Sequence, residues 1–378
     1  MNGIYYYLIA FTLIWILALL LKNKLPDYGF EIDFPLIMWK TKRLRGLIKR
    51  ISDISPRFWK YFMTLGIVVS FIAMVFMTWL LVSSLETITT TPSVSLIIPG
   101  VEMPGSSIYV PFGYGLIALA TVLIVHEFSH GIVALSEKIS IKSIGLLLFA
   151  ILPGAFVEPD EEELLASKKI SQLRVYAAGS VANMSLALVA ILMVFLISTY
   201  AIPANFSENG IEISRVVSDS PASECLKEGM IIESIDNHVV NDSESYLGVV
   251  GNFKPGDNVT VGTDQGDFTL TLGKNPQNES VGYFGIQASK HFELKNNDFG
   301  PLPWVYFSLL ELFQWVFTLN LGIGLFNLLP MKPLDGGKML EVLLSYKLPE
   351  RQYKPLVNSI SVIMAMIIVF SLLANFIF

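Results

Sequence analysis

Long apolar segments dominate this chain and restrict it to a membrane architecture. Six of them approach or exceed the ~20 residues that a helix needs to cross a bilayer; they lie at approximately 3–21, 62–85, 112–135, 173–200, 303–330 and 356–378. Hydrophobic residues make up 53% of the 378 positions and charged residues only 15%, well below the charged fraction of a typical soluble domain. The sequence therefore predicts a polytopic α-helical membrane protein with about six transmembrane helices.

The positive charges between the apolar segments indicate an orientation. Residues 22–60 carry ten Lys or Arg and residues 331–355 carry five, whereas residues 86–111 carry none. Because cytoplasmic loops are enriched in Lys and Arg, both basic segments are expected in the cytoplasm. Alternation of the spans then predicts an external N-terminus and an external 201–300 segment. Topology and contact with anionic lipid explain the basic segment, so no nucleic-acid partner is expected.

Residues 201–300 differ in character from the rest of the chain. Charge rises there, Gly, Asp, Asn and Ser become frequent, and short alternating runs such as 258–261 and 268–272 are separated by turn signals. A β-rich, water-soluble domain is therefore expected between two apolar segments. The chain divides into an N-terminal span with a basic cytoplasmic loop, the first part of a membrane core, the inserted domain and the second part of the core, at 1–61, 62–200, 201–300 and 301–378.

A metal-binding pattern lies in the third apolar segment, where residues 126–130 are His-Glu-Phe-Ser-His. On a helix, His126 and His130 share one face, with Glu127 beside them. Catalytic zinc typically takes three protein ligands and keeps a fourth position for water, so a third ligand is required. The two remaining histidines lie in the expected external domain, and the chain has one cysteine, so we expect a carboxylate.

Asp335 is the candidate for that carboxylate. It follows Pro330 and Pro333 at the end of the fifth apolar segment and precedes two glycines. Non-helical backbone at membrane depth persists only where it faces protein or a water-filled cavity. An ionisable residue in such a place is a functional-site hypothesis by default. In the predicted topology the third and fifth spans both run inward, so Asp335 and the histidines can meet at a similar depth.

These motifs together resemble the site-2 protease family of intramembrane zinc metalloproteases. The resemblance rests on H-E-F-S-H-G at 126–131 and on N-L-L-P-M-K-P-L-D-G-G at 327–337. An insert similar to a PDZ domain adds to it, through Ser-Pro-Ala at 220–222 and Ile-Asp-Asn at 235–237. The resemblance covers most of residues 95–340.

The resemblance implies a metal centre and a set of roles. One zinc ion per chain would be held by His126, His130 and Asp335, and Glu127 would be the general base. Asn327 would hydrogen bond the substrate backbone or the oxyanion.

Two further parts of the sequence are expected near the site. Asn183, in a G-x-x-x-N pattern that begins at Gly179, is a further candidate for substrate binding. The apolar segment 143–157 is short and carries Pro153-Gly154, so it is expected to be a re-entrant or strand-like piece packed against the site.

The implied function is that of an intramembrane zinc metalloendopeptidase. Its substrates would be single-span membrane proteins, cut within their transmembrane segments after a first cut in the ectodomain. A compact chain without the cysteine-rich insert of the animal enzyme suggests a multi-pass protein of a prokaryotic cell membrane, with the active site toward the cytoplasmic half. A metal-binding transporter and a catalytically silent scaffold remain as alternatives. Glu127 favours the enzyme, because a transporter needs no general base beside its ligands.

Overall fold

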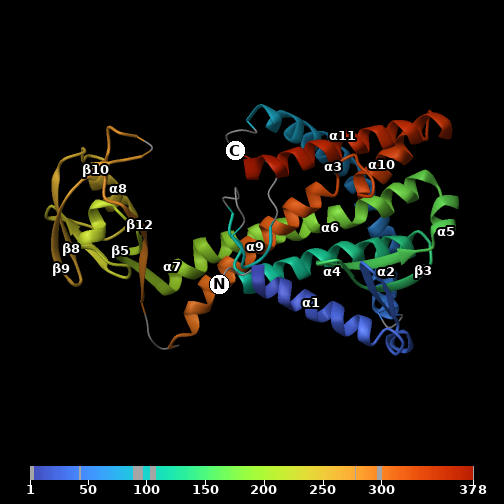
Figure 1. The fold of residues 1–378 in the computed structure, drawn as a ribbon, viewed down its shortest axis with the longest axis horizontal. Coiled ribbons are helices and arrows are strands. Elements are labelled where there is room, and N and C mark those ends of the chain that lie inside the picture. Colours follow the sequence, from blue (N-terminus) through green and yellow to red (C-terminus); the bar gives the residue numbers. More distant parts are fainter. Residues whose placement is uncertain are drawn as a thin grey trace. The chain divides into compact units, whose positions relative to one another are not determined.

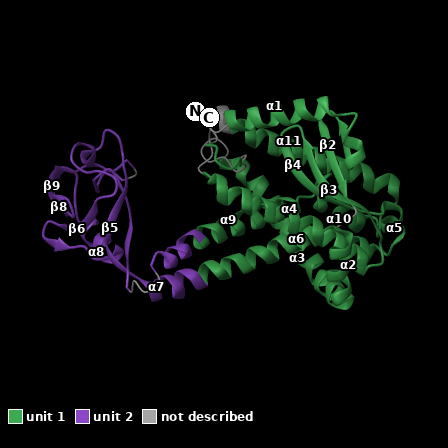
Figure 2. Ribbon diagram, turned by 90° about the horizontal axis from the view of Figure 1, so that it is seen from below, with its two compact units in different colours: residues 1–195, 309–378 green, residues 196–308 purple. Residues whose placement is uncertain are grey.

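The protein folds into two compact units, drawn green and purple in Figure 2. This computed structural model describes residues 4–41, 44–87, 97–102, 108–276, 278–295 and 300–377. One unit consists of residues 1–195 and 309–378 and holds the apolar helices; the other consists of residues 196–308 and is rich in strands. Parts of the sequence-based topology lie outside the described residues, namely Lys42, Arg43 and much of the segment 86–111.

Helices that are long and apolar enough to cross a membrane form the larger unit. Within the described residues there are five, accompanied by a shorter apolar helix, α1, at the first predicted span. The prediction of about six apolar helices is confirmed to this extent, with the first shorter than a full span. The helices of this unit are α1 (Ile4–Leu20), α2 (Arg45–Ile54), α3 (Pro56–Ser83), α4 (Phe112–Ser136), α5 (Glu161–Ala166), α6 (Lys169–Leu196), α9 (Val305–Phe326), α10 (Asp335–Leu344) and α11 (Glu350–Ile377).

A four-stranded antiparallel sheet packs against α4 in the larger unit (Figure 1). Segment 143–157 is strand-like, as predicted, because it forms most of a hairpin, and Pro153 and Gly154 lie within the second strand. The other hairpin comes from the basic segment, for which the sequence had indicated no strand. In the order β1-β2-β3-β4 the strands are Phe30–Asp33, Leu36–Thr41, Ile141–Phe149 and Leu152–Pro159. Strand β4 therefore lies at an edge of the sheet.

The tips of the two hairpins meet helix α1. The backbone N–H of Ala150 donates to the carbonyl of Pro35 across 2.7 Å, which joins the two turns. Trp15 of α1 donates its indole N–H to the carbonyl of Ala150 at 2.7 Å and packs edge-on against Phe34. The sheet is thus held at one end by an apolar helix and along one strand by α4.

Small residues allow the helices of the core to approach closely. A Cβ atom at Gly66 of α3 would lie 2.9 Å from a methyl carbon of Val181 on α6, so only glycine permits this contact. Ala134 of α4 and Ala177 and Ala178 of α6 are fully buried in the same core. Interfaces of this kind are typical of membrane helices, because small side chains let the backbones pack together.

A buried carboxylate ties three of these helices together. Glu137, one residue beyond α4, pairs with Arg174 of α6 at 2.8 Å and with Lys60 of α3 at 3.5 Å. The hydroxyl of Ser171 donates to it at 2.7 Å. Burial alone would raise the pKa of Glu137, but the bonds from Ser171 and Arg174 and the charges of Lys60 and Arg174 outweigh it, so the pKa lies below its usual value.

The smaller unit is a β-rich domain, as the alternating runs of the sequence predicted. Its main sheet has the order β12-β5-β6-β8-β9, and β7 pairs with β6. The Ile-Asp-Asn motif at 235–237 forms the tight turn between β6 and β7, in which Asp236 and Asn237 both have positive φ, at 48° and 62°. The elements are α7 (Ile202–Asn205), β5 (Phe206–Val216), β6 (Ile231–Ile235), β7 (His238–Val239), α8 (Ser243–Val250), β8 (Asn258–Thr263), β9 (Gly266–Thr271), β10 (Gly273–Lys274), β11 (Gly282–Tyr283) and β12 (Ile286–Leu294).

The core of the smaller unit comes from the inward faces of its strands. Ile213 of β5, Ile232 and Ile235 of β6, and Val259 and Val261 of β8 are completely buried. Alternation of buried and exposed positions is what a sheet with one covered face requires. The Ser-Pro-Ala motif begins a short 3₁₀ helix at Pro221–Glu224. The domain therefore has a hydrophobic core of its own.

Candidate metal centre

Helix α4 supplies two imidazoles to one point in the larger unit. His126 and His130 are four residues apart and on the same face of the helix, and their ring centres are 4.8 Å apart. Their Nε2 atoms approach within 3.2 Å of each other. Both side chains are about 12% exposed, so they lie at the wall of a cavity and not in bulk solvent.

A break between two helices brings Asp335 to the same point. Helix α9 ends at Phe326, and α10 begins at Asp335 after eight residues that are not helical. Gly336 and Gly337 lie directly on the backbone of the connecting segment, at Leu328 and Met331, where any side chain would collide. The two glycines after Asp335 are thus required by the fold of the segment that aims the carboxylate.

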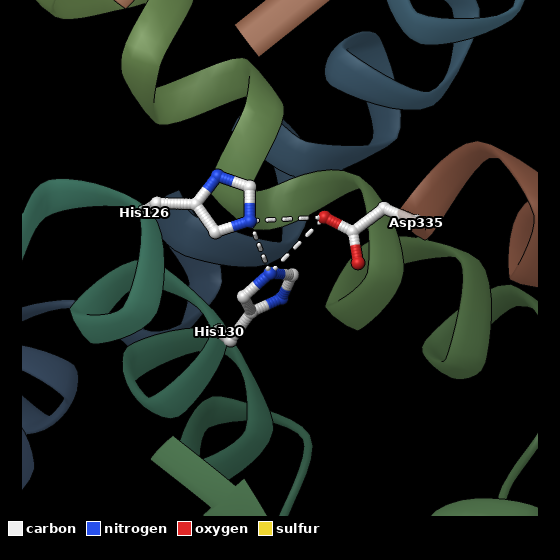
Figure 3. Close-up of side chains that lie close together, drawn as sticks. All are labelled: His126, His130 and Asp335. Carbon is white, nitrogen blue, oxygen red and sulfur yellow. Dashed lines mark hydrogen bonds and ion pairs between the residues drawn. The ribbon is translucent and has the colours of Figure 1, made fainter. Parts of the chain in front are cut away.

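The three side chains point toward one another and form a compact triangle (Figure 3). Oδ2 of Asp335 lies 3.2 Å from Nε2 of His126 and 3.2 Å from Nε2 of His130. Asp335 is buried, and this oxygen has no hydrogen-bond partner within the described residues.

Such a triangle fits a metal ion. Zinc bonds of ~2.0–2.1 Å in a tetrahedral arrangement separate the ligand atoms by about 3.3 Å, close to the distances found here. The two imidazole nitrogens and the carboxylate oxygen also form a ligand set that zinc accepts. The residues present therefore fit the ion, and they leave one coordination position free of protein.

Glu127 and Asn327 line the cavity that contains this cluster. The cavity has a volume of about 270 Å³ and is bounded by α4, β4, α6 and the segment between α9 and α10. Glu127 does not join the cluster; its Oε2 accepts a hydrogen bond from the backbone N–H of Val157 on β4 at 2.9 Å. The amide of Asn327 donates to the carbonyl of Ile323 one turn earlier, at 3.1 Å.

Asn183 occupies a different position from the other predicted residues. It is completely buried on α6, and its side-chain amide lies 3.3 Å from Nδ1 of His126. It is not among the residues that line the cavity. The structure thus brings together all six predicted residues, with Asn183 behind a candidate ligand and the other five at the cavity. Its contact with substrate stays a prediction.

A larger polar cavity, not anticipated from the sequence, adjoins the first. It has a volume of about 640 Å³ and shares Tyr176, Pro333 and Lys338 with the metal cavity. The ammonium group of Lys338 lies 5.5 Å from the ring centre of Tyr176, at the junction of the two spaces. The one signal for Lys338 in the sequence is its position directly after the Asp-Gly-Gly motif.

The fold and the site define a polytopic membrane protein with a metallopeptidase-type cluster of two histidines and one aspartate. Comparison with protein families leads to a specific assignment. The family model described as "Peptidase family M50" matches residues 114–368, which are well over half of the chain. The chain belongs to this family, the site-2 protease family of metalloproteases.

Two curated relatives are similar to parts of the chain. An uncharacterised protein of Methanocaldococcus jannaschii, MJ0971, is 33% identical over 228 residues, which are 60% of this chain and 56% of that protein. The membrane-bound transcription factor site-2 protease homolog of Arabidopsis thaliana is 28% identical over 134 residues, 35% of this chain and 26% of that protein. The chain thus spans about half of the length of the first relative and a quarter of the second.

Solved structures are similar to a smaller part of the chain. The PDZ domains of the SdrC-like proteins from Listeria monocytogenes and Listeria innocua each cover 22% of this chain at 22% identity, with a TM-score of 0.20. The matched regions span 90% of the first PDZ domain structure and 97% of the second.

Proposed function

We propose that this protein is an intramembrane zinc endopeptidase that hydrolyses peptide bonds in the transmembrane segments of single-span membrane proteins. The observation that carries the proposal is the position of Glu127. It lines the cavity of the His126, His130 and Asp335 cluster without being part of that cluster. Metal-assisted hydrolysis requires a carboxylate that lies beside the metal site and is not itself a ligand.

One zinc ion per chain would be held by Nε2 of both histidines and by the carboxylate of Asp335. When bound, zinc supplies a Lewis acid and lowers the pKa of a water molecule to about 7, which makes a nucleophile available at neutral pH. Asp335 is the first residue of α10, where the helix dipole favours a negative charge. This position thus favours the ionised carboxylate that a cation binds.

Glu127 and Asn327 would do the remaining chemistry. Glu127 accepts a proton from the attacking water and delivers it to the nitrogen of the leaving amine as the C–N bond breaks. The amide of Asn327 donates to the substrate carbonyl oxygen, where negative charge develops. Loss of such a donor costs ~2.7–4 kcal/mol in comparable sites, or roughly a hundred- to a thousand-fold in kcat.

The edge strand β4 is a candidate binding site for the substrate backbone. A transmembrane helix hides its carbonyls in i to i−4 hydrogen bonds, so it must unwind before hydrolysis. An unwound segment could pair with the open side of β4, which borders the cavity through Val157 and Pro159. Substrates with Gly or Pro near the cut are favoured, because each weakens the helix by ~1 to ~3 kcal/mol.

The topology is part of the proposal. The positive charges favour a cytoplasmic location for segments 22–60 and 331–355, and so an external one for the N-terminus and the β-rich domain. His126 lies fourteen residues after Phe112, the start of α4, or about 21 Å along the helix. With α4 running inward, the site lies in the cytoplasmic half of a bilayer core that is ~30 Å thick.

The decisive experiment separates metal binding from hydrolysis. The full-length protein, reconstituted in liposomes with a single-span test substrate, should cleave it, whereas the Glu127→Gln variant should not, although both bind one zinc. Glu31→Gln is the matched control, because Glu31 is an exposed carboxylate on the far edge of the same sheet. Zinc binding without cleavage by the wild-type protein would favour the transporter or scaffold, and cleavage by Glu127→Gln at the wild-type rate would overturn the role of Glu127.

A further inference from the structure

One face of helix α6 lies against both histidines of the cluster. Three positions on this face, each one turn from the next, meet the imidazoles. The carbonyl of Val175 lies 2.7 Å from Nδ1 of His130, and the amide of Asn183 lies 3.3 Å from Nδ1 of His126. Gly179 stands between them. The nitrogens that Val175 and Asn183 contact are those that face away from Asp335.

Gly179 leaves room for the two rings. A Cβ atom at this position would lie 2.5 Å from Nε2 of His130 and 2.6 Å from Nε2 of His126, closer than real Cβ contacts come. The backbone of α6 therefore lies directly against the metal-facing edges of the imidazoles. No other residue type allows the rings and the helix to keep these positions.

The orientation of the rings determines which nitrogen must carry hydrogen. Nε2 of both rings faces Asp335 and the metal position, so in the neutral, ligand-competent imidazoles the hydrogen resides on Nδ1. The carbonyl of Val175 can only accept, so it selects this tautomer for His130. For His126 the same selection requires an acceptor at Asn183.

The carboxamide of Asn183 can provide that acceptor. With Nδ2 turned to His126, its Oδ1 is buried and has no hydrogen-bond partner among the described residues. A half-turn about the Cβ–Cγ bond exchanges the two atoms, which have nearly the same shape, and gives both Oδ1 and the Nδ1–H of His126 a partner. When Nδ1 of His126 carries the hydrogen, the other orientation would set two N–H donors against each other and leave Oδ1 without a donor, so this orientation is favoured.

The surroundings of Asn183 hold it in place. Gly324 of α9 packs against it so closely that a Cβ atom there would lie 3.1 Å from the Cβ of Asn183 and 3.3 Å from the carbonyl of Ser180. The side chain is completely buried between α4 and α9. It is not among the residues that line the cavity, whereas it contacts His126 directly.

We infer that Asn183 is a positioning residue that accepts a hydrogen bond from Nδ1–H of His126 and holds Nε2 of that ring toward the metal, as Val175 does for His130. This rests on the proposed function, because it assumes that the cluster binds zinc. Gly179 and Asn183, one turn apart on the same face of α6, would then help to position the two histidine ligands. Outer partners of this kind typically change metal affinity 10- to 100-fold when removed.

The test is the zinc affinity of purified full-length variants, measured by competition with a chelator, together with the visible spectrum of the Co²⁺-loaded protein. Asn183→Leu should bind zinc 10- to 100-fold more weakly than the wild type and alter the Co²⁺ spectrum. Asn183→Asp should stay within a few-fold of the wild type, because a carboxyl group keeps the acceptor oxygen. Asn320→Leu is the matched control; Asn320 is an equally buried asparagine of α9 that bonds Thr121 and the Val316 carbonyl.

The outcomes separate this inference from the proposed function. If the wild type does not bind zinc, the proposed function fails. If the wild type binds zinc and Asn183→Leu binds equally well, or if Asn183→Asp is as weak as Asn183→Leu, the positioning role is wrong.

A second comparison does not depend on Asn183. Gly179→Ala should lose most of the zinc affinity, whereas Gly113→Ala, on the same helix as the histidines and with open space around it, should keep it. Equal zinc binding by the two glycine variants would contradict the close fit of α6 against the rings.

If the Asn183→Leu variant does not fold, the comparison of Asn183→Ala with Asn183→Asp decides the role of Asn183 in the same way.

Discussion

The backbone N–H of Val157 donates to the carboxylate of Glu127 across 2.9 Å, which joins the edge strand β4 to helix α4 beside the metal cluster. This bond holds Glu127 away from Asp335 and the histidines, so it keeps a carboxylate in the cavity that is not a ligand. It also shows which side of β4 is open. Because backbone groups alternate along a strand, Ala155, two residues earlier, directs its N–H and carbonyl to the same side.

Strand pairing by the substrate can be tested at that residue. Ala155→Pro removes one outward donor and leaves the ladder between β3 and β4 in place, since edge strands tolerate proline where the N–H faces outward. The loss of one hydrogen bond of ~0.5–1.5 kcal/mol predicts a fall of about two- to tenfold in kcat/KM for a membrane substrate. Unchanged zinc content and thermal stability are the controls. Full cleavage activity in this variant would show that substrate does not pair with β4.

The ligand set predicts how metal content responds to substitution. Asp335→Ala, His126→Ala and His130→Ala should each lower the zinc content well below one per chain, because each removes one of three protein ligands. Elemental analysis of the purified protein measures this, with Glu341→Gln, a carboxylate of the adjoining cavity, as the control. Full zinc occupancy in Asp335→Ala would mean that the third ligand lies elsewhere.

The buried pairing of Glu137 predicts a pH dependence of stability. Its folded-state pKa lies below the ordinary value of about 4.5, so its contribution is fully present above that value and is lost as the pH falls through it toward the folded pKa. Glu137→Gln should cost about 2–3 kcal/mol at neutral pH. This is less than the ~3–5 kcal/mol for a fully buried pair, because Lys60 and Arg174 keep some exposure.

Thermal unfolding in lipid nanodiscs between pH 7 and pH 3 measures this effect. The difference between the wild type and Glu137→Gln should shrink as the pH falls below about 4.5. Glu350→Gln serves as the comparison, because Glu350 pairs with Lys354 on an exposed helix surface, where such pairs contribute little. A constant difference across the range would mean that the network is not held by charge.

The orientation in the membrane is open to a labelling test. On a Cys225→Ser background, Lys347→Cys lies in the predicted cytoplasmic segment and Glu279→Cys in the predicted external domain; both positions are exposed. In intact cells an impermeant thiol reagent should modify the cysteine at 279 and not the one at 347. The reverse pattern would overturn the orientation derived from the positive charges.

The sequence was informative wherever the signal was local. The apolar segments, the β-rich insert and the H-E-F-S-H helix depend on runs and spacings that a linear pattern contains. Asp335 could be found because its prolines and glycines interrupt an apolar run, although the reason for both glycines emerged only from their contact with the backbone at 328 and 331.

Features that depend on non-local packing could not be found in this way. The hairpin of β1 and β2 becomes part of a larger sheet only by pairing with β3, about a hundred residues later. Gly145 permits this pairing, because a side chain there would collide with the carbonyl of Trp39. The contact of Asn183 with His126 likewise spans two helices, and nothing in the local sequence indicates which neighbour this asparagine meets.

The inserted domain is expected to restrict which substrates reach the metal. Its two ends are adjacent, because the N–H of Lys295 donates to the carbonyl of Asn205 at 2.9 Å. Replacement of residues 206–294 by a short Gly-Ser linker should therefore leave the membrane unit able to fold. If the external domain excludes bulky ectodomains, the wild type should cut a pre-clipped substrate at least tenfold faster than the full-length one.

The deletion variant should cut both forms of that substrate at similar rates, provided that it retains zinc and activity on the clipped form. Retention of zinc and of activity on the clipped form shows that the membrane unit is intact, so a change in the ratio of the two rates reports on the domain alone. If the deletion variant still prefers the clipped substrate tenfold, selection takes place within the membrane unit. The domain would then have another role, because exclusion of bulky ectodomains by this domain must end when the domain is removed.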